Sequence, residues 1–386
     1  MVKKNELLRI IGALILLMCS MPACSLVTSN PGDVANTVTL EERGVWLNRT
    51  EMFVPREKLL KLLDDLKKAH FTSVYVDVYF QGSVIYPDSR YLPESPKVSE
   101  PDILTWLLPE IKKRGMRAEA WVEYGFYAFH TPDAGKTTDR GVFLNKYPEL
   151  TAIADDGVTY LHNKEWGDFF SLCPANPMSH ELLINVFTEI LARYPFDGIN
   201  LDRIRYPNEH FCYCNYCKEH FKSDTGIELK PYKEGTPEYR QWAEWRKEQL
   251  NRFMKSASAK FRSIRPGLTV SLDSIPPEDI DSKGQGWDNW LKEGYIDAAM
   301  PMLYGDSNFN QRIMKLKTFP YWSEKIFPGL DAAGLKPEVI LEQIKFAKSQ
   351  GAKGIVFWYS GKLEDDLPGL KSGPFAQPAV SPLGKK

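Results

Sequence analysis

Near the middle of the chain lies the sequence Phe196-Asp197-Gly198-Ile199-Asn200-Leu201-Asp202-Arg203-Ile204-Arg205-Tyr206-Pro207, an apolar run that ends at a carboxylate and two arginines. This pattern predicts a buried parallel strand. Because side chains alternate between the two faces of a strand, Asn200 and Asp202 are expected on the same face. Parallel barrels carry their catalytic acids at the C-terminal ends of strands. Asp202 is therefore either a catalytic acid or a structural acid that pairs with Arg203 or Arg205.

Similar runs recur along the chain and alternate with helical patterns. The eight predicted strands are 43–47, 74–79, 118–123, 198–204, 269–273, 298–304, 326–330 and 354–358. The predicted helices are 56–70, 102–114, 180–194, 239–262 and 337–349, each with apolar residues spaced three and four apart. Eight such units predict an α/β fold, a TIM (β/α)8 barrel. An open doubly wound sheet is the second interpretation, but no glycine-rich phosphate loop follows the first strand.

The connections after the third and fourth predicted strands are unusually long. They run over 124–177 and 205–238, whereas such loops usually have roughly 2–6 residues. Both begin where a strand ends, so we expect them to rise over the C-terminal face of the barrel and to shape a substrate cleft.

Acidic residues lie at or near the ends of four predicted strands, namely Asp77, Glu123, Asp202 and Asp273. Glycoside hydrolysis needs two carboxyl groups, one as general acid and one as nucleophile or base. Asp202 and Asp273 stand at equivalent ends of adjacent strands, so they form the expected pair, and Glu123 is the other candidate partner. Each acid taken singly could instead form an ion pair or cap a helix.

Aromatic residues occur at the same strand ends, and they can offer flat surfaces to the apolar faces of sugar rings. The predicted substrate contacts are Trp46, Asp77, Tyr124, Arg205, Tyr304 and Trp358. Tyr304 and Trp358 are the preferred sugar platforms, although any such ring could simply cover the barrel rim. The planar fork of Arg205 could bind a hydroxyl group, a carboxylate or Asp202 itself.

The N-terminal sequence predicts export. Basic residues precede a largely apolar run over 10–18, which is shorter than the about 20 residues that span a bilayer and is typical of a signal peptide. Ala23 followed by Cys24 resembles the lipobox at which bacterial lipoproteins are cleaved and acylated, with ordinary secretion as the alternative. Ser25 then favours the periplasmic face of an outer membrane, if the cell has one.

The remaining composition completes the predicted organisation. The net charge is −1 with acidic and basic residues intermixed, so no nucleic-acid-binding surface is indicated. We expect a lipoprotein signal peptide over 1–23, a flexible tether over 24–40, the barrel over 41–370 and a poorly ordered tail over 371–386.

Four cysteines remain in the predicted barrel domain: Cys173 in the first long loop, and Cys212, Cys214 and Cys217 in the second. Four thiolates suit a closed structural zinc site, which would pin the two loops together without a catalytic part. Export also favours disulfides, so disulfides or free thiols are the alternative. No motif for an organic cofactor, a zinc protease or a serine hydrolase is present.

Several blocks of the sequence resemble the glycosyl-hydrolase-like 10 family, formerly a domain of unknown function. They are Arg43-Gly44-Val45-Trp46, Arg114-Gly115-Met116, Leu201-Asp202-Arg203-Ile204-Arg205-Tyr206-Pro207, Pro301-Met302-Leu303-Tyr304 and Gly354-Ile355-Val356-Phe357, within residues 41–366. The resemblance implies a TIM-barrel glycosidase fold on a bacterial envelope lipoprotein, a cell-wall glycan as substrate, and Asp202 as the signature aspartate. The family commonly has Asn-Pro-Tyr after the third-strand tryptophan, whereas Trp121 here precedes Val122-Glu123-Tyr124. The role of Glu123 therefore stays open.

The cysteine pattern also resembles the structural zinc site of one family of barrel β-galactosidases, which supports zinc by analogy.

The expected function is hydrolysis of an envelope polysaccharide, such as peptidoglycan glycan strands stripped of their peptides. Asp202 would be nucleophile or base and Asp273 the general acid, with Glu123 as the alternative to Asp273. The competing hypothesis is a glycan-binding lipoprotein that has kept the barrel and lost the chemistry. A metal-dependent deacetylase would need histidine ligands at strand ends, and the six histidines do not lie there.

Overall fold

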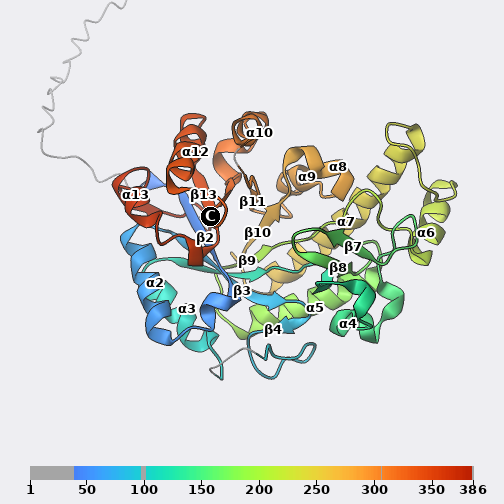
Figure 1. Cartoon of the computed structure of the whole chain (residues 1–386), viewed down its shortest axis with the longest axis horizontal. Coiled ribbons are helices and arrows are strands. Elements are labelled where there is room, and N and C mark those ends of the chain that lie inside the picture. The colour runs from blue at the N-terminus through green and yellow to red at the C-terminus, as the bar shows by residue number, and fades with distance from the viewer. Residues whose placement is uncertain (1–38, 97–100, 306, 385–386) are drawn as a thin grey trace, which may run out of the picture. The chain divides into compact units, whose positions relative to one another are not determined.

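The computed structural model describes residues 39–96, 101–305 and 307–384. Eight parallel strands form a barrel in the order β11-β10-β9-β5-β3-β2-β13-β12 (Figure 1). They are β2 (Glu42–Leu47), β3 (Ser73–Phe80), β5 (Arg117–Val122), β9 (Gly198–Leu201), β10 (Thr269–Ser274), β11 (Ala298–Pro301), β12 (Gly329–Asp331) and β13 (Gly354–Trp358). Parallel bridges from Ala299 to Ile326 and from Met302 to Gly329 connect the first and last strands of this order, β11 and β12. The predicted TIM barrel is confirmed.

Helices on the outside of the barrel follow most strands. The longer ones are α2 (Arg56–Lys68), α3 (Leu104–Lys113), α5 (Pro177–Arg193), α7 (Pro237–Ile264), α10 (Phe309–Leu316) and α12 (Pro337–Ser349). The shorter ones are α1 (Arg49–Met52), α8 (Ile280–Lys283), α9 (Trp287–Lys292), α11 (Trp322–Lys325) and α13 (Leu367–Ser372). In α2, Leu59, Leu63 and Leu66 form the buried stripe expected of an amphipathic helix. Among the described residues, no helix combines the length and apolar character needed to cross a bilayer.

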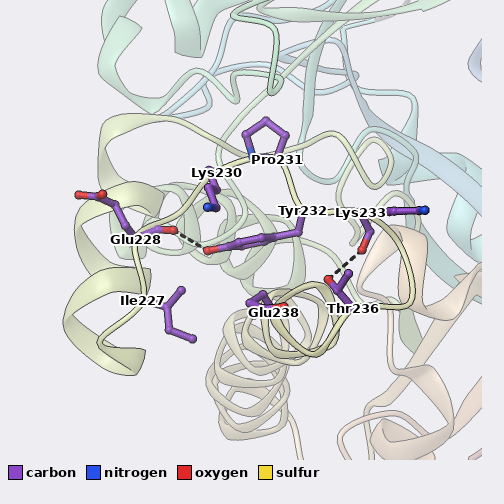
Figure 2. A pocket seen from close by; sticks show the side chains of 8 residues that line it. All are labelled: Ile227, Glu228, Lys230, Pro231, Tyr232, Lys233, Thr236 and Glu238. Carbon is purple, nitrogen blue, oxygen red and sulfur yellow. Dashed lines mark hydrogen bonds between the residues drawn. The ribbon is translucent and has the colours of Figure 1, made fainter.

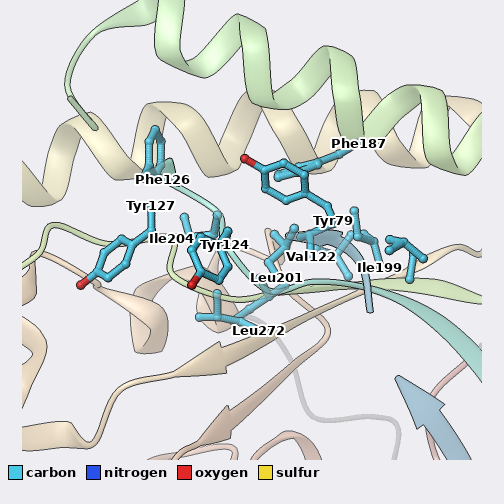
Figure 3. Close-up of a cluster of buried hydrophobic side chains, with 14 of the residues drawn as sticks. Tyr79, Val122, Tyr124, Phe126, Tyr127, Phe187, Ile199, Leu201, Ile204 and Leu272 are labelled. Atoms are coloured by element: carbon cyan, nitrogen blue, oxygen red, sulfur yellow. The ribbon is translucent and has the colours of Figure 1, made fainter. Parts of the chain in front are cut away.

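The barrel has an inner and an outer core. Trp46, Tyr75, Trp121 and Met300 belong to the inner cluster, which fills the barrel. The outer cluster lies between the strands and the helices, and Figure 3 shows part of it, with Tyr79 beside Phe187 of α5. A register shift between Asp77 and Tyr79 breaks the alternation of β3. Tyr79 therefore packs against Phe187 rather than in the barrel mouth, with ring centroids 5.6 Å apart.

Both long connections are folded. After β5, the strands β6 (Tyr127–Thr131), β8 (Gly167–Ser171) and β7 (Tyr160–Asn163) form an antiparallel sheet beside α4 (Gly141–Lys146). After β9, the chain forms α6 (Asn215–Thr225). A bridge between Ala154 and Phe211 joins the two connections, and their elements lie on the same side of the barrel strands in Figure 1.

The C-terminal tail has structure, which corrects the expectation of poor order for residues up to 384. Its strand β14 (Ala379–Val380) pairs in parallel with β1 (Thr39–Leu40). The Ser381 hydroxyl group donates to Glu42, and Leu383 joins the inner cluster with 8% of its surface exposed. Apolar contacts at the N-terminal end of the barrel thus hold a segment that has no sequence periodicity. The predicted signal peptide, Cys24 and almost all of the tether lie outside the described residues.

Candidate active site

Asp202 and Asp273 lie side by side at the C-terminal end of the barrel. Pairing of Leu201 with Leu272 sets their register, so the next residue on each strand is the acid. One step earlier, Asn200 donates to Ser271 Oγ at 2.9 Å inside the barrel. Because side chains alternate, both acids share that inward face at the barrel mouth. Their exposed fractions are 5% and 1%, respectively.

Two arginines that are separated by Ile204 contact Asp202 and Glu123 separately. Arg205 Nη1 lies 3.4 Å from Asp202 Oδ1, which also accepts the backbone N–H of Arg203. Arg203 Nη1 instead contacts Glu123, at 3.2 Å from Oε1 and 2.9 Å from the carbonyl oxygen. A positive φ of 51° at Arg203 turns the chain toward the β5 side. No pattern in the sequence predicts this contact between Arg203 and Glu123.

Asp273 is the candidate proton donor. Burial and the neighbouring charge of Asp202 raise the pKa of Asp273 well above its usual range. Its Oδ1 atom has no hydrogen-bond partner among the described residues. A raised pKa favours the protonated form of the carboxyl group, which is the form that the acid in glycoside hydrolysis needs.

Glu123 and Asp77 form a second acidic group beside this pair. Burial raises the pKa of Glu123, and the Arg203 charge opposes that rise. Burial and the Glu123 charge raise the pKa of Asp77 well above its usual range, while Arg49 opposes it. Asp77 is completely buried, and its contact with substrate stays a prediction. Arg49, the first residue of α1, was not singled out because no motif surrounds it.

The expected sugar platforms divide into two groups. Tyr304 and Trp358 are half-buried, with ring centroids 6.3 Å apart, and Trp358 packs edge-on against Trp121. Trp46 is only 1% exposed and donates from Nε1 to Asn200 Oδ1 at 2.9 Å inside the barrel. Trp46 therefore has no free face for a sugar ring, which corrects that expectation.

Tyr124 is also buried, with 3% of its surface exposed. Its ring lies 4.5 Å from the guanidinium carbon of Arg203, and its hydroxyl oxygen accepts from Gln81 at 3.2 Å. Through these contacts Tyr124 positions Arg203, and its ring has no free face for stacking on a sugar. The expectation that Tyr124 contacts the substrate is therefore corrected.

The predicted metal ligands come together where the two long connections meet. Cys173, Cys212, Cys214 and Cys217 are buried, and their Sγ atoms lie within 4.8 Å of one another. A pocket lies between α6 and the start of α7 (Figure 2). Tyr232 and Thr236 are among its lining residues, and none of the predicted site residues lines it.

Comparison with known proteins agrees with this geometry. The chain matches the family described as glycosyl hydrolase-like 10 over residues 41–333. Glycosyl hydrolase DigH of Escherichia coli is 24% identical over 347 residues, covering 76% of this chain and 74% of its own length. Glycosyl hydrolase YngK of Bacillus subtilis is 21% identical, covering 73% of this chain and 55% of its own length.

Solved structures share the fold at low sequence identity. The glycoside hydrolase domain of PgaB (BpsB) from Bordetella bronchiseptica superposes with a TM-score of 0.66 at 15% identity, over 86% of this chain and 98% of that domain. The catalytic domain of β-amylase from Paenibacillus polymyxa gives 0.60 at 13% identity, over 88% and 98% of the two chains.

Proposed function

This chain belongs to the glycosyl hydrolase-like 10 family, and we propose that it hydrolyses glycosidic bonds of an envelope polysaccharide. The observation that carries the proposal is the pair of carboxyl groups at the barrel mouth. Asp202 is ion-paired with Arg205, while burial and the Asp202 charge raise the pKa of Asp273. Two carboxyl groups in different surroundings meet the needs of acid and nucleophile or base.

In the proposed reaction, Asp273 gives its proton to the glycosidic oxygen as the bond from that oxygen to the anomeric carbon breaks. Asp202 either attacks the anomeric carbon, giving a glycosyl-enzyme that water then hydrolyses with Asp273 acting as base, or takes a proton from a water molecule that attacks that carbon directly. Tyr304 and Trp358 support the sugar, since both rings remain partly exposed beside the acids. The product anomer, read by NMR in the first minutes of reaction, distinguishes the two roles of Asp202.

The proposed substrate is peptidoglycan glycan stripped of its peptides. Its support is the predicted export signal together with the aromatic platforms, which suit a polysaccharide chain. We also propose lipid anchoring at Cys24. Membrane fractionation tests this, because Cys24→Ser should move the protein out of the membrane fraction, and unchanged fractionation would contradict the anchor.

The decisive experiment compares Asp202→Asn with the full-length wild type on stripped and intact peptidoglycan, with released sugars measured by mass spectrometry. We expect a loss of about 10²- to 10⁴-fold in rate with an unchanged circular dichroism spectrum. Asp288→Asn, at an exposed position, is the matched control and should keep full activity. Full activity of Asp202→Asn would refute the assignment. Wild-type protein that binds glycan without releasing sugars would instead establish the non-catalytic binding alternative.

A further inference from the structure

Four thiol groups gather where the two long connections meet. Cys173 lies between β8 and α5, and the other three, Cys212, Cys214 and Cys217, surround the start of α6. Each of the four has at most 3% of its surface exposed. A buried thiol group can pack as a small apolar side chain, but four that converge on one point are also the ligand set of a closed structural metal site.

The spacing of the sulfur atoms distinguishes a metal site from disulfides. Cys173 Sγ lies 3.5 Å from Cys217 Sγ and 3.6 Å from Cys214 Sγ. A disulfide bond requires about 2.05 Å. Four thiolates bound tetrahedrally at about 2.3 Å from zinc place their sulfur atoms about 3.8 Å apart. The observed distances are close to the sulfur–sulfur spacing of a tetrahedral zinc site. Both contacts involve the Cys173 sulfur atom, which could form only one disulfide bond.

The surroundings suit the charge of a metal-thiolate centre, which for four thiolates and Zn²⁺ is −2. Cys214 is the N-cap of the 11-residue helix α6, so the positive end of the helix faces the cluster. Arg246 is completely buried and donates to the carbonyl oxygen of Phe211, the residue before Cys212, at 2.8 Å. Within the described residues no carboxylate forms an ion pair with Arg246. Its guanidinium group also donates to the carbonyl oxygens of Asn208, Asp281 and Ser282, and a positive charge beside the segment that carries Cys212 favours an anionic centre there.

We propose that Cys173, Cys212, Cys214 and Cys217 bind one structural zinc ion that fastens the two long connections to each other. Backbone hydrogen bonds already join the same segments, from Tyr213 N to the Ile153 oxygen at 2.7 Å and from Asp155 N to the His210 oxygen at 3.0 Å. Four protein ligands leave no open position, so the ion acts on stability and takes no part in the chemistry.

The centre also bears on the geometry of the acids. Cys173 follows β8 of the three-stranded sheet, and strand β6 of the same sheet contains Tyr127. The Tyr127 ring lies 5.5 Å from the guanidinium carbon of Arg203. Arg203 in turn binds Glu123. Loss of the ion is therefore expected to loosen the Arg203 side of the barrel mouth while leaving the barrel strands intact.

The test is metal analysis of the full-length protein, purified without chelators. We expect about one zinc ion per chain, and its loss in Cys214→Ser. Cys24→Ser, which changes a cysteine outside the cluster, should keep the ion. Chelation should lower the melting temperature of the wild type and leave that of Cys214→Ser unchanged, because only the wild type has an ion to lose.

A second measurement covers the case in which Cys214→Ser fails to fold. Wild-type protein loaded with Co²⁺ should show thiolate-to-metal charge-transfer absorption and the intense visible bands of tetrahedral cobalt. Wild-type protein that contains no zinc and takes up no cobalt would overturn the proposal, and peptide mapping would then show whether the four cysteines are free thiols or form disulfides.

Discussion

Asp273 has surroundings that favour a protonated carboxyl group. It is 1% exposed, and burial followed by the charge of Asp202 raises its pKa well above the usual range. A general acid works only while protonated, so activity should fall as the pH rises through this raised pKa. Asp273→Asn should lower kcat on glycans by about 10²- to 10⁴-fold and remove that alkaline limb. Aryl glycosides whose leaving group needs no proton should lose far less, which pH profiles of both substrates would show.

The same raised pKa predicts an effect on stability. Because the folded-state pKa lies above the unfolded-state value, this contribution to stability is complete below the unfolded-state pKa. It is lost as the pH rises through the folded-state pKa. Asn cannot ionise, so Asp273→Asn should gain stability relative to the wild type as the pH rises. Melting temperatures across pH, with Asp288→Asn as control, would contradict this if the wild type and Asp273→Asn changed in parallel.

At the scale of single residues, the sequence predicts the face of a strand on which a side chain lies better than it predicts how deeply that side chain is buried. Alternation along β9 and β10 places Asp202 and Asp273 on the inward face, as expected. The same reasoning assigned Trp46 and Asp77 to the substrate, yet both lie within the protein. Depth in a barrel depends on the stagger between strands, and the β3 bulge after Asp77 depends on its partner strand. Neither leaves a local signal in the sequence.

At the scale of elements, β9 is shorter than predicted. The apolar pattern extends to Ile204, but the strand ends at Leu201 because Arg203 takes a positive φ. The early end lets Arg203 reach Glu123, whereas a continuing strand would have kept its side chain among the outer helices. The helices α2 and α12 match their predicted ranges closely because their apolar spacing is long and regular.

Gly125 sits where this turn meets the β5 side. Its φ is +39°, and a Cβ atom there would lie 2.2 Å from the carbonyl oxygen of Asp202. Gly125→Ala should therefore displace the Asp202 backbone and lower kcat as well as stability. Gly157 is a matched control, because its φ is +89° but an added Cβ meets nothing within 4 Å. Gly157→Ala should cost about 1–2 kcal/mol of backbone strain with unchanged kcat. Equal kinetics for the two variants would contradict the close approach.

At the scale of the whole molecule, alternating strands and helices suffice to predict the barrel, because each unit is long enough to carry a period. The C-terminal closure is different. A two-residue strand such as β14 has no period to detect, and its position depends on pairing with β1 at the far end of the described chain. The three-stranded sheet of the first long connection is also composed of short strands, so only its cleft-forming position was predicted.

Leu383 tests whether the C-terminal segment closes the barrel. Its side chain joins Trp46, Tyr75 and Trp121 in the inner cluster, with 8% of its surface exposed. Leu383→Ala should lower the free energy of unfolding by about 2 kcal/mol, near the low end for buried leucines because the segment can partly relax. Leu40→Ala is the matched control, since Leu40 lies on the paired strand β1 and is 48% exposed. Its cost should be no more than about 0.5 kcal/mol. Urea unfolding would measure both values, and equal losses would mean that the segment covers the barrel without packing into it.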